Sequence, residues 1–222
     1  MNKDRMLKKI GMLAMALGLA SSAVWAATPL ETGVLALQHE WEAIRYQSPA
    51  SEKLGRWERL AAQSQELVAQ HPQQAEPLIW QGIVLSSWAG DKGGLGALSM
   101  VKEAKVMYEK ALAINPQAME GSAYNSLGVL YYKVPGWPIG FGDKEQAKAL
   151  LEKALQINPK GIDPNFFYGE YWAEVGRPDQ ARVYLERALA APPRPSRHIA
   201  DTGRKEEIRA LINTLKPSSA AR

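Results

Sequence analysis

Three segments of the chain end in nearly the same way, and this repetition limits the possible folds more than any other feature. They read AKVMYEKALAINP, AKALLEKALQINP and ARVYLERALAAPP. In each, an alanine is followed by a large apolar residue after four positions, an alanine after three more and a proline after five more. Steps of four and three place the first three residues on one face of a helix, and proline cannot continue it. The repeated positions are Ala104, Tyr108, Ala111 and Pro116; Ala147, Leu151, Ala154 and Pro159; and Ala181, Leu185, Ala188 and Pro193.

Each repeated segment is preceded by a second apolar stretch that contains a glycine. These stretches read PLIWQGIVLSSW, YNSLGVLYYK and NFFYGEYW, and their glycines are Gly82, Gly128 and Gly169. A glycine inside a helix costs about 1 kcal/mol relative to alanine, and close packing between two helices is the usual compensation. We therefore predict three helical hairpins that cross at these glycines. Residues 36–46 and 59–72 indicate a fourth, degenerate pair.

The combined pattern resembles the tetratricopeptide repeat. The last copy, residues 162–195, fits that family's period of about 34 residues without gaps. The resemblance covers residues 36–195 and implies an all-α, right-handed solenoid of three to four helical hairpins with loop insertions. Ile208, Leu211 and Leu215 recur at helical spacing in a tail that mixes basic and acidic residues. We expect this tail to form a capping helix rather than a separate binding site, within a repeat domain over residues 27–215.

Two hairpins contain extra residues. The packing glycine precedes the first repeated alanine by 12 residues in the last copy, but by 19 and 22 in the two copies before it. We predict insertions of seven and ten residues at 133–139 and 91–100. The stretch VPGWPIGFGD, residues 134–143, overlaps the seven-residue insertion and lacks the GxxxxGK[ST] pattern of a phosphate loop. Gly142 is expected to form the hairpin turn, and Asp143 to cap the following helix.

Trp137 lies in this insertion between a glycine and a proline. One interpretation is that its ring folds back and covers the end of the hairpin. The other is that a stiff loop holds it at the rim of the concave face, where it contacts a partner. A tryptophan held in this way provides much contact area for little loss of entropy.

The first 26 residues have the three-part organisation of a secretory signal peptide. Four basic residues precede an apolar core at 10–20, and Val24 and Ala26 suit a cleavage site after Ala26. We therefore expect a periplasmic protein, with no stable membrane anchor once the signal peptide is removed. Residues 216–222 are expected to form a disordered tail.

Charge and cysteine content exclude several kinds of partner. Removal of residues 1–26 takes away four basic residues and one acidic residue, so the formal net charge falls from +4 to +1. The mature chain then has little charge with which to attract nucleic acid. Because the sequence contains no cysteine, disulfides, thiolate metal sites and a lipid-bearing cysteine are excluded.

No arrangement of residues indicates catalysis. His39, His71 and His198 are far apart and have no metal-binding spacing, and there is no GxSxG motif. We therefore expect no metal site, no cofactor and no enzyme activity.

Repeat arrays of this type usually bind their partners on the concave face, which the first helix of each hairpin forms. Periodicity predicts that this face is lined by Ile79, Ile83, Asn125, Val129, Tyr132, Phe166 and Glu170. Trp137 is a further candidate for contact with a partner. The predicted function is a non-catalytic adaptor or scaffold that binds a protein or peptide there.

Two further resemblances concern function. The motifs VPGWPxGFGD and NPxGIDPNFFYG, with the tail APPRPSRHIADTGRKEEI, are similar to those of exported bacterial tetratricopeptide-repeat proteins. The insertion-bearing hairpins also resemble the tetratricopeptide-repeat subunit that accompanies some TRAP-type solute transporters. That resemblance implies the alternative function, an accessory protein that binds or passes a small solute in its cleft.

Overall fold

The computed structural model describes residues 27–215, in which nine α-helices and no strands are present. The predicted signal peptide and disordered tail lie outside these residues. The helices are α1 (Pro29–Tyr46), α2 (Ala50–Gln70), α3 (Ala75–Lys92), α4 (Gly94–Ile114), α5 (Ala118–Lys133), α6 (Lys144–Ile157), α7 (Ile162–Glu174), α8 (Pro178–Leu189) and α9 (His198–Thr214). No helix in the described range is long and apolar enough to cross a membrane.

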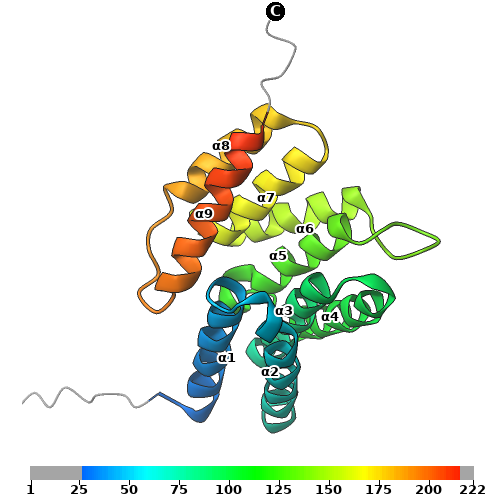
Figure 1. Ribbon diagram of the computed structural model, residues 1–222, viewed down its shortest axis with the longest axis vertical. Helices are drawn as coiled ribbons and strands as arrows, with labels where there is room; N and C mark the ends of the chain where they lie inside the picture. The colour runs from blue at the N-terminus through cyan, green and yellow to red at the C-terminus, as the bar shows by residue number, and fades with distance from the viewer. Residues whose placement is uncertain (1–26, 216–222) are drawn as a thin grey trace, which may run out of the picture.

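Successive helices pair into four hairpins, α1–α2, α3–α4, α5–α6 and α7–α8, and α9 follows them (Figure 1). Each hairpin packs against the next, and clusters of buried apolar side chains fill the spaces between them. The prediction of an all-α, tetratricopeptide-like solenoid is confirmed. The weak first copy is a complete hairpin.

In each of the hairpins α3–α4, α5–α6 and α7–α8, the large repeated residue of the second helix packs against the glycine of the first helix. A Cβ atom on Gly82 would lie 2.5 Å from Tyr108, one on Gly128 would lie 2.8 Å from Leu151, and one on Gly169 would lie 2.9 Å from Leu185. The repeated alanines beside this contact are completely or almost completely buried: Ala104, Ala111, Ala147, Ala154, Ala181 and Ala188. The axes of each hairpin therefore approach more closely than larger side chains would allow.

The helix ends follow local rules of capping. The Oδ1 atom of Asp143 accepts a hydrogen bond of 2.9 Å from the backbone N–H of Gln146, which makes Asp143 the N-cap of α6 as predicted. Pro116 and Pro159 each lie just beyond a helix end. Gly142 is needed for close approach rather than for a left-handed turn, because a Cβ atom there would lie 1.9 Å from the carbonyl oxygen of Val134.

The two insertions take different forms. The seven-residue insertion lies in the predicted loop between α5 and α6, except for Lys133, which ends α5. The ten extra residues at 91–100 do not form a loop: α3 continues to Lys92 and α4 begins at Gly94. Gly93 and Gly94 have φ angles of +64° and +67°, which glycine adopts without strain, so the chain reverses there in a very short turn. This insertion therefore lengthens both helices of its hairpin.

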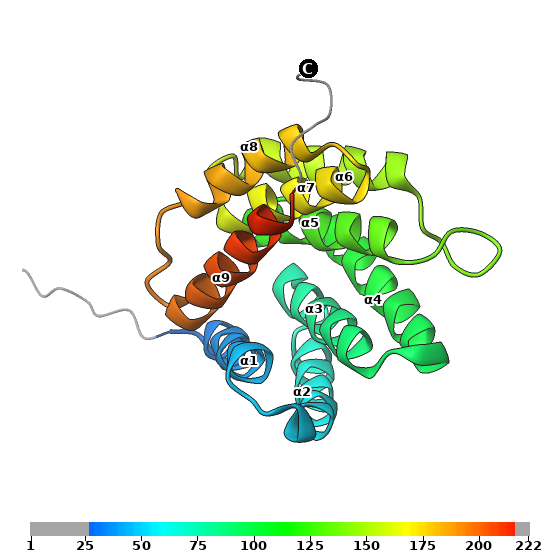
Figure 2. The same ribbon diagram turned by 45° about the horizontal axis from the view of Figure 1, so that its top comes forward.

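Helix α9 does more than cap the last repeat. Its Ile208 is fully buried beside Leu185 and Ala188 of α8, as a capping helix requires. Its other end contacts α1 of the first hairpin (Figure 2). There Ala200 joins the core cluster of Trp41 and Ile44. The sequence predicts a helix that caps the last repeat, whereas in the tertiary structure this helix also closes the array against the first helix.

Candidate functional site

The closed arrangement leaves a cavity of about 900 Å³. Its walls come from α1, α3, α4, α5, α7 and α9, and from residues 190–197, which join α8 to α9 and are called the strap below. Because every hairpin contributes at least one helix or connecting segment, the whole array shapes this space. A cavity of this size can hold a small molecule or a short segment of polypeptide.

One part of the cavity wall is apolar and aromatic. Trp41 and Trp80 meet edge to face with ring centroids 6.3 Å apart, and the indole N–H of Trp41 donates a 2.8 Å hydrogen bond to Ser87 Oγ. The apolar residues of this part of the wall include Trp41, Trp80, Ile83, Leu98, Val101, Met119, Val129 and Leu130. Such a wall favours a ligand with a substantial apolar body.

Three polar atoms at the cavity are buried and have no hydrogen-bond partner among the described residues. They are Asn125 Oδ1, Trp80 Nε1 and Tyr46 Oη. A buried polar atom without a partner costs about 1–3 kcal/mol, so native proteins usually provide one. A bound molecule or ordered water in the cavity would satisfy these atoms.

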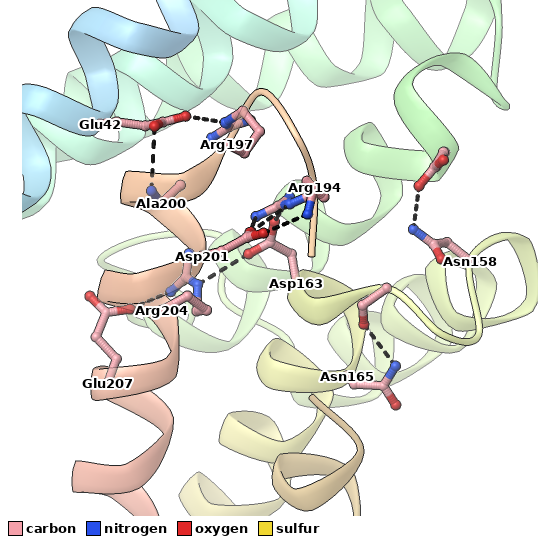
Figure 3. A network of polar contacts seen from close by, with 12 residues as sticks. Glu42, Asn158, Asp163, Asn165, Arg194, Arg197, Ala200, Asp201, Arg204 and Glu207 are labelled. Atoms are coloured by element: carbon pink, nitrogen blue, oxygen red, sulfur yellow. Dashed lines mark hydrogen bonds and ion pairs between the residues drawn. The ribbon is translucent and has the colours of Figure 1, made fainter. Parts of the chain in front are cut away.

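A network of ion pairs forms another part of the wall (Figure 3). Arg194 Nη1 contacts Asp163 Oδ2 at 2.8 Å, and Arg194 Nη2 contacts Asp201 Oδ1 at 2.6 Å. Arg204 Nε contacts Asp163 Oδ1 at 3.1 Å. Burial raises the pKa of Asp163, but the arginines outweigh it and lower the pKa to about 2. The network joins the strap and α9 to the start of α7.

A second set of ion pairs joins α9 to α1. Arg197 Nε donates to Glu42 Oε1, and the Ala200 N–H donates to Glu42 Oε2 at 3.4 Å (Figure 3). Arg45 Nη2 contacts Glu207 Oε1 at 2.7 Å. The Glu42 carboxylate is therefore paired with a guanidinium and lies at the N-terminus of α9, where the helix dipole favours negative charge.

The backbone adopts an unusual conformation at the start of α5. Met119 and Glu120 have φ angles of +48° and +55°, and both line the cavity. This left-handed region is unfavourable for residues with a Cβ atom, and such residues occur preferentially at functional sites. Asn158 Nδ2 donates a 2.6 Å hydrogen bond to Glu120 Oε2 and holds this turn against the end of α6.

The structure brings only some of the predicted concave-face residues to the cavity. Ile83, Asn125 and Val129 line it. Ile79 is completely buried in the core between hairpins, so a partner cannot reach it. Phe166 is buried in the core beneath α9.

Tyr132 and Glu170, also predicted to contact a partner, contact each other instead. Tyr132 donates a 2.5 Å hydrogen bond to Glu170 Oε2, and Lys133 lies 3.1 Å from Glu170 Oε1. Burial and the adjacent Glu170 charge raise the pKa of the Tyr132 hydroxyl, which therefore stays protonated. Periodicity alone did not separate the cavity wall from the contacts between hairpins.

Trp137 does not fold back over its hairpin, because its side chain is 90% exposed. Its ring is not part of the cavity wall, although Pro135 and Ile139 of the same loop are. The loop therefore lies at the edge of the cavity and presents Trp137 to solvent.

Three arginines of the strap and α9 are cavity residues that the sequence prediction missed. Arg194 and Arg197 of the strap and Arg204 of α9 line the cavity together with residues of α1 and α7. Their sequence signal was a basic cluster in the tail, which the neighbouring acidic residues concealed. Among the described residues, no three His, Asp or Glu side chains are placed to hold a metal ion.

The fold and the cavity define an α-solenoid whose last helix closes it against the first. Residues 139–200 match the family model described as Tetratricopeptide repeat. The chain also has the fold of a thermophilic TPR protein from Thermus thermophilus, with a TM-score of 0.55 and 21% identity over 85% of this chain and 93% of that one.

A second solved structure, MamA, is 18% identical with a TM-score of 0.44, over 76% of this chain and 92% of its own. No curated protein matches the sequence. The match to the Thermus thermophilus protein establishes the fold of the chain, and the family model covers residues 139–200.

Proposed function

We propose that this chain is a non-catalytic adaptor of the bacterial periplasm that binds a protein or peptide. Tetratricopeptide solenoids present an extended concave surface to their partners, which supports a role as a protein-interaction scaffold. The proposal rests on the loop between α5 and α6, which lies at the edge of the cavity. Two large apolar residues of this loop are exposed, Trp137 to 90% and Ile139 to 66%. Large exposed apolar side chains that lie together mark interaction sites.

Internal hydrogen bonds hold this loop. The N–H groups of Ile139 and Gly140 both donate to the carbonyl of Gly136 at 3.1 Å, and the Gly142 N–H donates to Pro135 O at 3.0 Å. The Asp143 N–H donates to Tyr131 O at 2.8 Å and ties the loop to α5. The loop therefore offers Trp137 in a preformed arrangement, which lowers the entropy cost of binding a partner.

The test compares Trp137→Ala with the wild type, each purified from a periplasmic extract under native conditions, with mass spectrometry of the retained polypeptides. We expect the variant to lose a specific polypeptide while its melting temperature stays nearly unchanged, because the ring packs against almost nothing. Leu54→Ala, at another exposed apolar side chain, is the control and should retain the polypeptide. A large fall in melting temperature with unaltered retention would reject this role for Trp137.

Export is a separate part of the proposal and rests on the basic and apolar pattern of residues 1–26. Mass measurement of the protein from a periplasmic fraction should show a chain that begins at Ala27. An intact N-terminus in the cytoplasmic fraction would reject this part and leave the adaptor role to be judged on binding.

A second candidate function is supported by the closure of the array. An open solenoid offers a long groove, whereas here α9 meets α1 and leaves a cavity of about 900 Å³, within the usual range for small-molecule sites. The chain would then be an accessory protein that holds or passes a small solute, as in TRAP-type systems. Native mass spectrometry should detect a stoichiometric small molecule if this function is correct.

A further inference from the structure

Helix α9 is attached to its two neighbours in different ways. Against α8 it packs apolar side chains, and its Ile208 is fully buried beside Leu185 and Ala188. Against α1, within residues 27–215, α9 contributes only Ala200 to the apolar cluster that contains Trp41. Because apolar burial is the main favourable contribution to helix packing, the attachment of α9 to α8 is the stronger of the two.

The strap joins α9 to α7 on the same side of the molecule. Arg194 of the strap contacts both Asp163 of α7 and Asp201 of α9. Arg204 of α9 contacts Asp163 as well. The last hairpin, the strap and α9 are therefore connected as one unit, and α9 is the edge of this unit that meets α1 (Figure 2).

The contact between α9 and α1, called the seam below, is mainly polar. Arg197 pairs with Glu42 (Figure 3), and Glu207 pairs with Arg45. The side chains of Glu42 and Arg197 are only 2% and 13% exposed, so both charges lose most of their water when the seam forms. In a buried ion pair this desolvation offsets much of the attraction, and the pair contributes little net stability. The free energies of the joined and separated seam are therefore similar.

The rest of the array can follow a separation at the seam. Within the described chain, α1 packs against α9 but not against α7 or α8. Each hairpin of a solenoid contacts mainly its neighbours, so small rotations at successive interfaces add up along the array. Such rotations can move the first and last helices apart while each hairpin stays intact.

We propose that the array is a clamp that opens and closes at the seam between α1 and α9. In the open form the last hairpin, the strap and α9 have moved away from α1 as one unit, and all helices are retained. Opening returns the charges of Glu42 and Arg197 to water and exposes the cavity wall at Trp41 and Trp80, which are buried in the closed form. The clamp controls access to the cavity and does not depend on whether the chain binds a polypeptide or a solute.

The first test measures two distances by double electron–electron resonance. Because the sequence contains no cysteine, spin labels attach only at introduced cysteines. The pair His39→Cys and Glu206→Cys spans the seam at exposed positions, and the pair Glu186→Cys and Glu206→Cys spans α8 and α9. We expect the seam distance to shift to longer values as salt is raised from about 0.05 to 1 M, because salt screens the attraction between the charges. The distance between α8 and α9 should stay constant.

A double-mutant cycle tests the ion pair itself. Glu42→Leu and Arg197→Met each leave one buried charge without a partner, so each should shift the seam distance to longer values even at low salt. The double variant buries neither charge. It should restore the short distance and lose most of the response to salt, because an apolar pair of similar size can replace a buried ion pair without loss. Arg45→Gln is the matched control and should change the distance little, since it breaks the more exposed pair with Glu207.

Circular dichroism of the same proteins separates opening from unfolding, because an open clamp keeps the helix content of the wild type. A seam distance that stays short in both single variants and at all salt concentrations would overturn the proposal. So would a double variant that opens as far as the single variants, since the ion pair would then be holding the seam closed by itself. If both distances lengthened together, α9 would be detaching from the whole array, which would also reject the clamp. The adaptor role is judged separately, because Trp137 lies outside the seam.

Discussion

At the scale of single residues, each of the last three hairpins depends on one glycine. Leu151 of α6 rests where the side chain of Gly128 would be, and the backbone carbonyl of Ala147 lies 3.3 Å from the same point. Neither neighbour can move without shifting α6, because Leu151 and Ala147 are completely buried. Interiors are packed too closely to absorb such a change in volume.

Gly128→Leu should therefore force α5 and α6 apart and lower the free energy of unfolding by about 3 kcal/mol or more. Gly55→Leu is the matched control, because a Cβ atom at that exposed position on α2 would meet only the end of Arg59, at 3.7 Å. The control should be at least as stable as the wild type, since leucine favours helix more than glycine does. Denaturant unfolding followed by circular dichroism measures both. Wild-type stability of Gly128→Leu would contradict the repeat alignment.

At the scale of a single helix, the start of α6 depends on the side chain of Asp143. Asp143→Ala removes the acceptor for the Gln146 N–H and should lower the free energy of unfolding by about 1 kcal/mol. Asp143→Asn keeps a capping oxygen and should lose much less. Denaturant titration of the three proteins checks the prediction. If both variants lost the same stability, the carboxylate charge rather than the capping bond would be responsible.

The junction of α7, α9 and the strap depends on the charge of Asp163. Its pKa is lowered from 3.8 to about 2 in the folded protein, so it binds fewer protons when folded than when unfolded. Its contribution to stability is therefore complete above about pH 4 and is lost as the pH falls toward 2. Arg194 and Arg204 remain charged throughout this range.

We expect the melting temperature of the wild type to fall steeply between about pH 4 and pH 2, and that of Asp163→Asn to start lower at neutral pH and change less over this interval. Thermal scans by circular dichroism at several pH values measure the two slopes. Parallel slopes would mean that other carboxylates dominate acid unfolding.

At the scale of the whole molecule, the contact between α9 and α1 decides whether the solenoid is open or closed. Gly203 of α9 packs against the Tyr46 ring of α1, and a Cβ atom there would lie 2.3 Å from the ring. The attachment of α9 to α8 uses a different face, where Ile208 is buried. The two contacts of α9 can therefore be separated by substitution.

Gly203→Val should push α9 away from α1, lower stability by about 1–3 kcal/mol and increase the radius of gyration while helix content is retained. Small-angle X-ray scattering measures the change in size. Gly55→Val, on an exposed part of α2, is the control and should leave the radius of gyration unchanged. If Gly203→Val had the wild-type dimensions, the closed form would not depend on this contact.

Much of the fold could be predicted from the sequence because its signals are local. The alanines, the large apolar residues and the glycines recur within single hairpins, so their spacing reports helices that are neighbours in the chain. The N-cap at Asp143 was predicted for the same reason. The insertion at 91–100 was expected to form a loop, whereas the chain makes one tight turn there and both helices are longer.

The candidate site was less predictable. Of the residues predicted by periodicity, Ile83, Asn125 and Val129 line the cavity, whereas Ile79 and Phe166 face neighbouring hairpins. A helix inside a solenoid buries several faces, so apolar spacing alone does not show which of them faces the cavity.

The sequence by itself determined that this chain forms helical hairpins and stacks them, because helix periodicity, capping and close helix packing act between residues near one another in the chain. The tertiary structure alone decided that the array closes. The pairing of Glu42 with Arg197 joins residues 155 positions apart, and no local pattern specifies such a contact. The cavity and its arginines follow from that closure, because they arise only when the first and last helices meet in space.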